Sequence, residues 1–230
     1  MTNQSSGRKT IMAITRATLM LFLTLHAAMN AVALFSASEY NALCAVKGSN
    51  IWAIAATSVI AVMILVHFAM AFYLVRQDMQ VNGPKPYATS GDNTSSQDMF
   101  TLGTIIILGL ALHLYNFWGK MMFAQITGTN EAEMAANGIY HLVNTFHGID
   151  RLHISGIIYT VLYLVWIAAL WSHLNRGMWK GMQSSSLSSK AWFPRVKTAC
   201  TIYSTIVMLT FAAVAITFCL GYTPSDFVNL

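Results

Sequence analysis

The stretch TLGTIIILGLALHLYNFWGK, residues 101–120, decides the fold of this chain. No formal charge falls between Asp98 and Lys120. About 20 helical residues, at 1.5 Å each, cross a hydrocarbon core of about 30 Å, so the stretch predicts a membrane-spanning helix. This stretch contains His113, and burying its imidazole in hydrocarbon costs free energy unless the ring has a partner.

Four other segments have the same character. Of the 230 residues, 56% are hydrophobic and 9% are charged, which excludes a water-soluble domain of this length. The first apolar run is too long for a cleaved signal peptide. We predict an all-α membrane protein, a single domain over residues 1–230 with five transmembrane helices at 11–35, 51–75, 99–123, 155–179 and 197–222.

The distribution of Lys and Arg predicts the orientation of the bundle. Cytoplasmic loops carry an excess of Lys and Arg, so the N-terminus is expected to be cytoplasmic. The outer side then has only Lys47, Lys120 and Arg151. The inner side has Arg8, Lys9, Arg16, Arg76, Lys85, Arg176, Lys180, Lys190, Arg195 and Lys197. The net charge of +5 therefore reflects topology, and no segment remains for a nucleic-acid-binding domain.

Four histidines lie in four different predicted helices. The rise of a helix places His26 about 22 Å and His113 about 21 Å from the inner ends of their helices. His67 and His173 lie about 12 Å and about 9 Å from the inner ends of theirs. The histidines therefore form an outer pair, His26 with His113, and an inner pair, His67 with His173.

Two layers of two imidazoles predict two b-type haems, roughly 10 to 13 Å apart. A structural zinc ion would need four ligands around one point. Gly109, four residues before His113, is expected to let a macrocycle approach the backbone. The alternative is that the histidines are hydrogen-bonded polar residues between helices.

Other polar residues near the predicted helix ends are candidates for cofactor binding. Arg16, Arg176 and Lys180 at the inner side could pair with haem propionates, or act as snorkelling anchors. An outer group could frame a quinone site, although an ordinary interfacial belt of Trp and Lys explains it as well. This group consists of Glu39, Asn116, Trp118 and Lys120.

The remaining segments carry few chemical signals. Residues 132–146 read as a short amphipathic helix lying at the outer interface. Three cysteines show no CxxC spacing, which excludes c-type haem attachment and iron–sulfur ligation, and whether Cys44 and Cys219 pair stays open. No GxGxxG motif is present for a flavin.

Two stretches carry a resemblance to a known family. SSQDM at residues 95–99, leading into GLALHLYNFWGK at 109–120, resembles the third span of the cytochrome b subunit of succinate dehydrogenases and fumarate reductases. AALWSHLNRGMW at residues 168–179 resembles the fourth span of the same five-helix, two-haem subunits. The order and spacing of all five spans agree with that family.

The resemblance implies a function in a respiratory chain. Such a subunit anchors a flavoprotein and an iron–sulfur protein to the cytoplasmic face of the bacterial inner membrane. Electrons pass between menaquinone and the iron–sulfur subunit through two haems, and dicarboxylate chemistry occurs on the partner subunits. The resemblance implies His26 and His113 as ligands of the haem iron distal to the iron–sulfur subunit, and His67 and His173 as ligands of the proximal one.

One position departs from the family pattern, and two other functions stay open. Some relatives carry a proton-conducting glutamate two residues before the fourth-span histidine, and Trp171 stands there. The first alternative function is a haem b anchor of a hydrogenase or a formate dehydrogenase. The second is a haem-free transporter or structural membrane anchor.

Overall fold

The computed structural model describes residues 6–83, 96–128, 132–148, 153–184 and 192–226, and all regular structure there is helical. The long helices are α1 (Ser6–Val32), α3 (Ile51–Asn82), α4 (Ser96–His113), α8 (His153–Ser184) and α9 (Phe193–Cys219). After α4 the helix continues as a π-helix, η1 (Leu114–Phe123), and then as α5 (Ala124–Thr127). The shorter elements are α2 (Ala37–Ser49), α6 (Ala132–Ala135) and α7 (Gly138–Phe146).

The prediction of five transmembrane helices is confirmed. Five helical stretches are long and apolar enough to cross a membrane: Thr10–Val32, Ile51–Val81, Asp98–Thr127, Ile154–Trp179 and Phe193–Cys219. Their ends differ from the predicted ones by a few residues. The second helix continues past residue 75 to Asn82, where Gly83 at φ 70° ends it, and the fifth begins at Phe193 because Pro194 suits a first turn.

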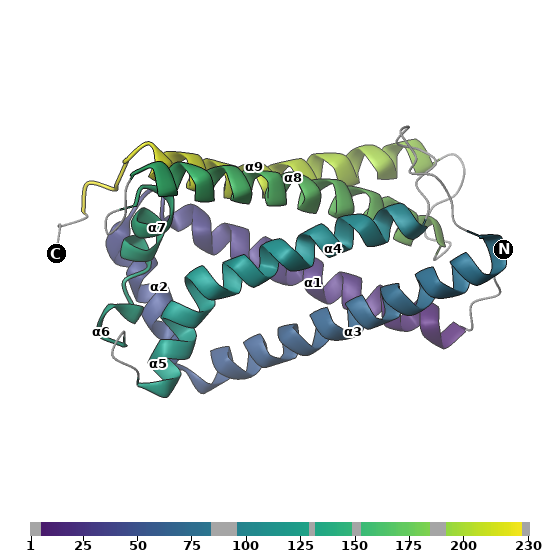
Figure 1. Cartoon of the computed structure of the whole chain (residues 1–230), viewed down its shortest axis with the longest axis horizontal. Helices are drawn as coiled ribbons and strands as arrows, with labels where there is room; N and C mark the ends of the chain where they lie inside the picture. The colour runs from purple at the N-terminus through teal and green to yellow at the C-terminus, as the bar shows by residue number, and fades with distance from the viewer. Residues whose placement is uncertain (1–5, 84–95, 129–131, 149–152, 185–191, 227–230) are drawn as a thin grey trace.

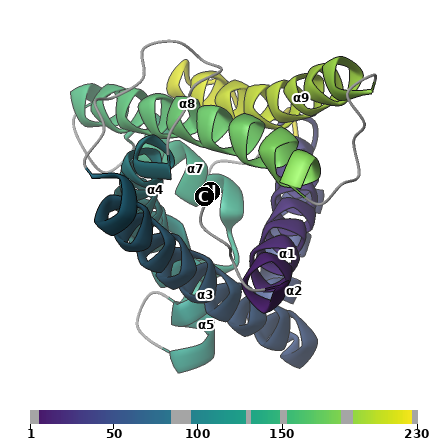
Figure 2. The same cartoon turned by 90° about the vertical axis from the view of Figure 1, so that its right-hand side faces the viewer.

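The long helices run lengthwise in alternating directions (Figure 1). Seen along the bundle, α1, α3, α4 and α8 surround a central axis, and α9 lies outside them against α8 and α1 (Figure 2). Neighbouring helices pack together, whereas α1 and α4, and likewise α3 and α8, face each other across the axis with at most isolated backbone contacts between described residues. Contacts across the axis are therefore made by long side chains or by side chains with rings.

The short helices α2, α5, α6 and α7 gather at one end of the bundle, which we call the α7 end (Figure 1). The opposite end, where α1 begins, is the N-end. A core of buried side chains fills the α7 end, including Tyr40 of α2, Ile139 of α7 and Phe218 of α9. A smaller cluster joins α1, α8 and α9 around Val207 and Met208. Among the described residues no comparable cluster lies around His67 and His173.

The segment 132–146 differs from the prediction. It forms two helices, because Asn137 accepts a hydrogen bond from Tyr140 N and caps a new helix, α7. Ile139 and Leu142 of α7 are 0% and 2% exposed, so the helix packs into the end of the bundle. The structure therefore divides the predicted single helix into two, and its location at the membrane interface stays a prediction.

Candidate functional site

Two pairs of histidines meet across the axis of the bundle. The ring centres of His26 on α1 and His113 on α4 are 5.8 Å apart, and we call these two residues the α7-end pair. The ring centres of His67 on α3 and His173 on α8 are 6.3 Å apart, and they form the N-end pair. Each pair joins two helices that face each other across the axis. The rings therefore make contact where the helix backbones are too far apart to do so.

Aromatic rings surround the α7-end pair. Phe22 stacks on His26 with ring centres 5.3 Å apart, and Phe117 lies 5.2 Å from His113. Trp166 of α8 lies 5.5 Å from the His113 ring and donates from Nε1 to the carbonyl of Ile106 at 3.0 Å. These rings make an apolar wall around the two imidazoles.

Gly109 has a different neighbour from the one expected. A Cβ atom built at this position would overlap the indole of Trp166. The space left by the missing side chain is therefore filled by that indole. That Gly109 lets a macrocycle approach the backbone stays a prediction, which this contact does not support.

The N-end pair has a more polar surrounding. The Thr15 hydroxyl lies 3.1 Å from His67 Nδ1. Gly103 of α4 lies beside His173, where a Cβ would meet only the ring atom Cε1 at 3.8 Å.

Both pairs have the ring separation that two imidazole ligands of one metal ion would need. A metal binds an imidazole nitrogen at about 2 Å, so two rings on opposite sides of one ion have centres about 6 Å apart. The observed separations are 5.8 and 6.3 Å. Among the described residues no third His, Cys, Asp or Glu joins either pair. Two ligands suit a haem iron, whose other ligands come from the macrocycle.

Two buried ring nitrogens also point to a missing partner. Nδ1 of His113 and Nδ1 of His173 are buried and have no hydrogen-bond partner among the described residues. A buried polar atom without a partner costs about 1–3 kcal/mol. A bound group that ligates or turns these rings would offset that cost. The four histidines therefore fit two bis-imidazole haems, although their role as ligands stays a prediction.

The depth difference between the two histidine pairs can be measured along α1. Thr15 contacts His67 of the N-end pair, and His26 of the α7-end pair follows eleven residues later on the same helix. Eleven residues correspond to about 16 Å along a helix. This is somewhat more than the 10 to 13 Å expected, because that estimate used predicted helix ends and ignored tilt.

The predicted propionate partners lie toward the N-end. Arg16 is half-buried on α1, and its guanidinium lies beside Gly181 of α8, where a Cβ would come within 3.0 Å of Nη1. It is also within electrostatic reach of both rings of the N-end pair. Arg176 is half-buried three residues after His173. The side chain of Lys180 lies outside the part of the chain that the structure describes.

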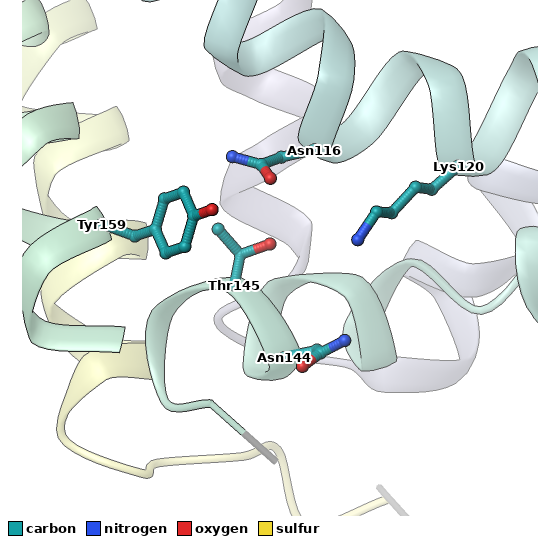
Figure 3. A pocket seen from close by; sticks show the side chains of 5 residues that line it. All are labelled: Asn116, Lys120, Asn144, Thr145 and Tyr159. Atoms are coloured by element: carbon teal, nitrogen blue, oxygen red, sulfur yellow. The ribbon is translucent and has the colours of Figure 1, made fainter. Parts of the chain in front are cut away.

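A small polar pocket opens at the α7 end (Figure 3). It is a shallow depression between η1, α7 and α8, open to solvent and with room for about one water molecule. It is lined by Asn116, Lys120, Asn144, Thr145 and Tyr159. The structure therefore brings together Asn116 and Lys120, two of the four residues of the predicted quinone site.

The other two members of that group lie elsewhere. Trp118 is 38% exposed and packs on Phe123, with ring centres 5.4 Å apart. Glu39 is exposed in the first turn of α2. Neither lines the pocket.

The pocket reaches the α7-end pair through one buried contact. Asn116 Nδ2 donates to the Tyr163 hydroxyl at 3.4 Å. The Tyr163 ring in turn lies 6.2 Å from the ring of His113. Among the pocket residues Asn144, Thr145 and Tyr159 were not predicted, because only the tertiary fold brings α7 and α8 beside η1.

The cysteines are free in the structure. Cys44 is buried against Gly138 and Tyr40, and burial raises the pKa of its thiol. Cys219 lies at the end of α9, where its carbonyl oxygen is 3.2 Å from His147 Nδ1. A pairing of Cys44 with Cys219 is therefore not present.

Comparison of the chain with models of protein families, with curated proteins and with solved structures finds no match.

Proposed function

We propose that this chain is a di-haem cytochrome b of a membrane-bound respiratory complex. The observation that carries the proposal is the meeting of four histidines in two cross-bundle pairs, with ring centres 5.8 and 6.3 Å apart. Haem iron ligated on both faces has no open position for oxygen, and it transfers single electrons. The chain's own contribution would be to hold two such groups at two depths of the membrane and to exclude water from them.

We further propose that the α7-end pocket is where quinone exchanges electrons and protons with the chain. Lys120 and the amide of Asn116 offer hydrogen-bond donors for quinone carbonyl oxygens. The Asn116–Tyr163 contact joins this pocket to the surroundings of His113. The resemblance of residues 109–120 and 168–179 to succinate dehydrogenase and fumarate reductase subunits supports menaquinone as the substrate.

The proposed orientation has the N-end in the cytoplasm. Basic residues of the described chain gather at that end, whereas Lys47 and Lys120 belong to the α7 end. The N-end group comprises Arg8, Arg16, Arg76, Arg176, Arg195 and Lys197. A flavoprotein and an iron–sulfur subunit would dock at this face, on the cytoplasmic side of a bacterial inner membrane. Five apolar helices support a multi-pass protein in a lipid bilayer.

Optical spectra of the purified chain test the haem assignment. We expect b-type bands in the reduced-minus-oxidised spectrum, and about half of that signal in His67→Ala and in His113→Ala. His147→Ala is the control, because His147 contacts the Cys219 carbonyl and belongs to neither pair. A wild-type protein without these bands would favour a haem-free transporter or structural anchor.

Purification of the native complex tests the choice of respiratory enzyme. We expect a covalent flavin and succinate or fumarate activity to copurify with a tagged form of this chain. A hydrogenase or formate dehydrogenase activity in their place would contradict the proposal while leaving the haems intact.

Substitution of Lys120 tests the quinone pocket. Lys120→Ala should raise KM for a menaquinol analogue several-fold, since one hydrogen bond to a charged donor contributes about 1.5–3 kcal/mol before solvent screening. Lys47→Ala, at the same end of the bundle but outside the pocket, is the matched control. An equal effect of both substitutions would argue for a general loss of charge.

A further inference from the structure

The Thr15 hydroxyl is a hydrogen-bonding partner of Nδ1 of His67, whereas Nδ1 of His113 and of His173 has no partner among the described residues. Thr15 lies on α1 and is 1% exposed. Its Oγ1 atom is 3.2 Å from the carbonyl of Met12, three residues earlier on the same helix. The same atom is 3.1 Å from Nδ1 of His67, which belongs to α3. One hydroxyl therefore joins two helices at the N-end pair.

A hydroxyl has a single proton, so the two contacts require different roles. Both bonds form at once if Thr15 donates to the Met12 carbonyl and accepts from Nδ1–H of His67. A neutral imidazole carries only one N–H group, so this arrangement leaves a lone pair on Nε2 of His67. That nitrogen is then the one available to a metal.

We propose that Thr15 is a positioning residue that sets the tautomer of His67 and lowers the reduction potential of the haem held by the N-end pair. This inference rests on the proposed haem function. An acceptor on the second ring nitrogen makes a ligating imidazole more basic, which favours the more positive ferric iron. Thr15 contacts His67 of the N-end pair, and Nδ1 of His113 in the α7-end pair has no such partner among the described residues, so the effect should be confined to the haem of the N-end pair.

Substitutions at Thr15 separate this role from simple packing. Thr15→Val keeps the size and β-branching of the side chain but removes the acceptor. Thr15→Ser keeps the hydroxyl and removes a methyl group. Thr160→Val is the matched control, because Thr160 is also buried in a membrane-spanning helix and its hydroxyl donates to the Gly156 carbonyl rather than to a histidine.

A redox titration of the purified chain, followed at the b-type bands, measures the effect. We expect two components in the wild type, and an upward shift of one midpoint potential in Thr15→Val while the other is unchanged. Thr15→Ser and Thr160→Val should titrate like the wild type. The shifted component should be the one that His67→Ala lacks. Loss of that single haem in Thr15→Val, with both haems retained in Thr15→Ser, would support the same role.

Other outcomes would overturn the inference. Unchanged potentials in Thr15→Val would show that the hydroxyl does not act on the ligand, and equal shifts of both components would indicate a general change of structure. Either result would leave the proposed function standing, because both haems would still be present. A wild-type chain without haem would instead overturn the proposed function itself.

Discussion

Substitution of Gly109 by alanine tests the contact between α4 and α8 beside the α7-end pair. The added Cβ would overlap the Trp166 indole, which can move away only by giving up its hydrogen bond to the Ile106 carbonyl. Overpacking of this kind costs about 1–3 kcal/mol, and the lost hydrogen bond about 1 kcal/mol more. The higher helix propensity of alanine offsets about 1 kcal/mol of this loss. The expected net loss in the free energy of unfolding is about 1–3 kcal/mol.

Thermal unfolding in detergent measures this loss. For a chain of this size, 1 kcal/mol corresponds to about 2–4 °C in Tm, so Gly109→Ala should unfold several degrees below the wild type. Gly177→Ala is the matched control at the same pair of helices, because its Cβ would meet only the flexible end of Met99, at 3.9 Å. Equal Tm values for Gly109→Ala and the wild type would refute the reasoning, as would an equal loss in Gly177→Ala.

Two further predictions concern the α7 end. Phe218→Ala should lose about 3–5 kcal/mol of unfolding free energy in denaturant titrations, since Phe218 is 0% exposed, whereas Leu209→Ala, at 63% exposed, should lose far less. Asp226 accepts hydrogen bonds from Ser38 N at 3.0 Å and Ala37 N at 2.8 Å, which hold the pKa of its carboxyl well below the usual range. These hydrogen bonds are fully formed above the usual carboxyl pKa and are lost as pH falls through the lowered one, so the protection factors for hydrogen exchange at both amides should fall only in strong acid. In Asp226→Asn the exchange should be faster at neutral pH as well; identical rates would count against the attachment.

Much of the bundle could be predicted from composition and spacing. Membrane spans depend on local hydropathy and length, so all five were found. The two histidine levels also follow from simple geometry, because alternating helices with a fixed rise place His26 near the depth of His113, and His67 near that of His173. In the structure these are the residues whose rings meet.

Some elements had signals that were not used. The segment between the first two spans contains α2, whose start is marked by Ser36 followed three residues later by Glu39. This is the pattern of a capping box, and Ser36 Oγ does accept from Glu39 N. Asn137 is a comparable signal for the start of α7.

Other features had no local signal. The π-helix η1 follows His113 within an uninterrupted apolar run, and nothing in its residues distinguishes it from α-helix. The pocket combines Lys120, Asn144 and Tyr159 from three elements, so it depends on how α7 closes the bundle. The bond from Thr15 to His67 likewise depends on the rotation of α1 against α3.

The ratio of haem to polypeptide tests the central claim most directly. Haem b extracted from the purified chain and quantified against protein from amino-acid analysis should give a ratio of two. His26→Ala and His173→Ala should each reduce this ratio to about one, since each pair is proposed to hold one iron. A wild-type ratio near zero, or a ratio of two that survives both substitutions, would contradict the assignment of the two histidine pairs as haem ligands.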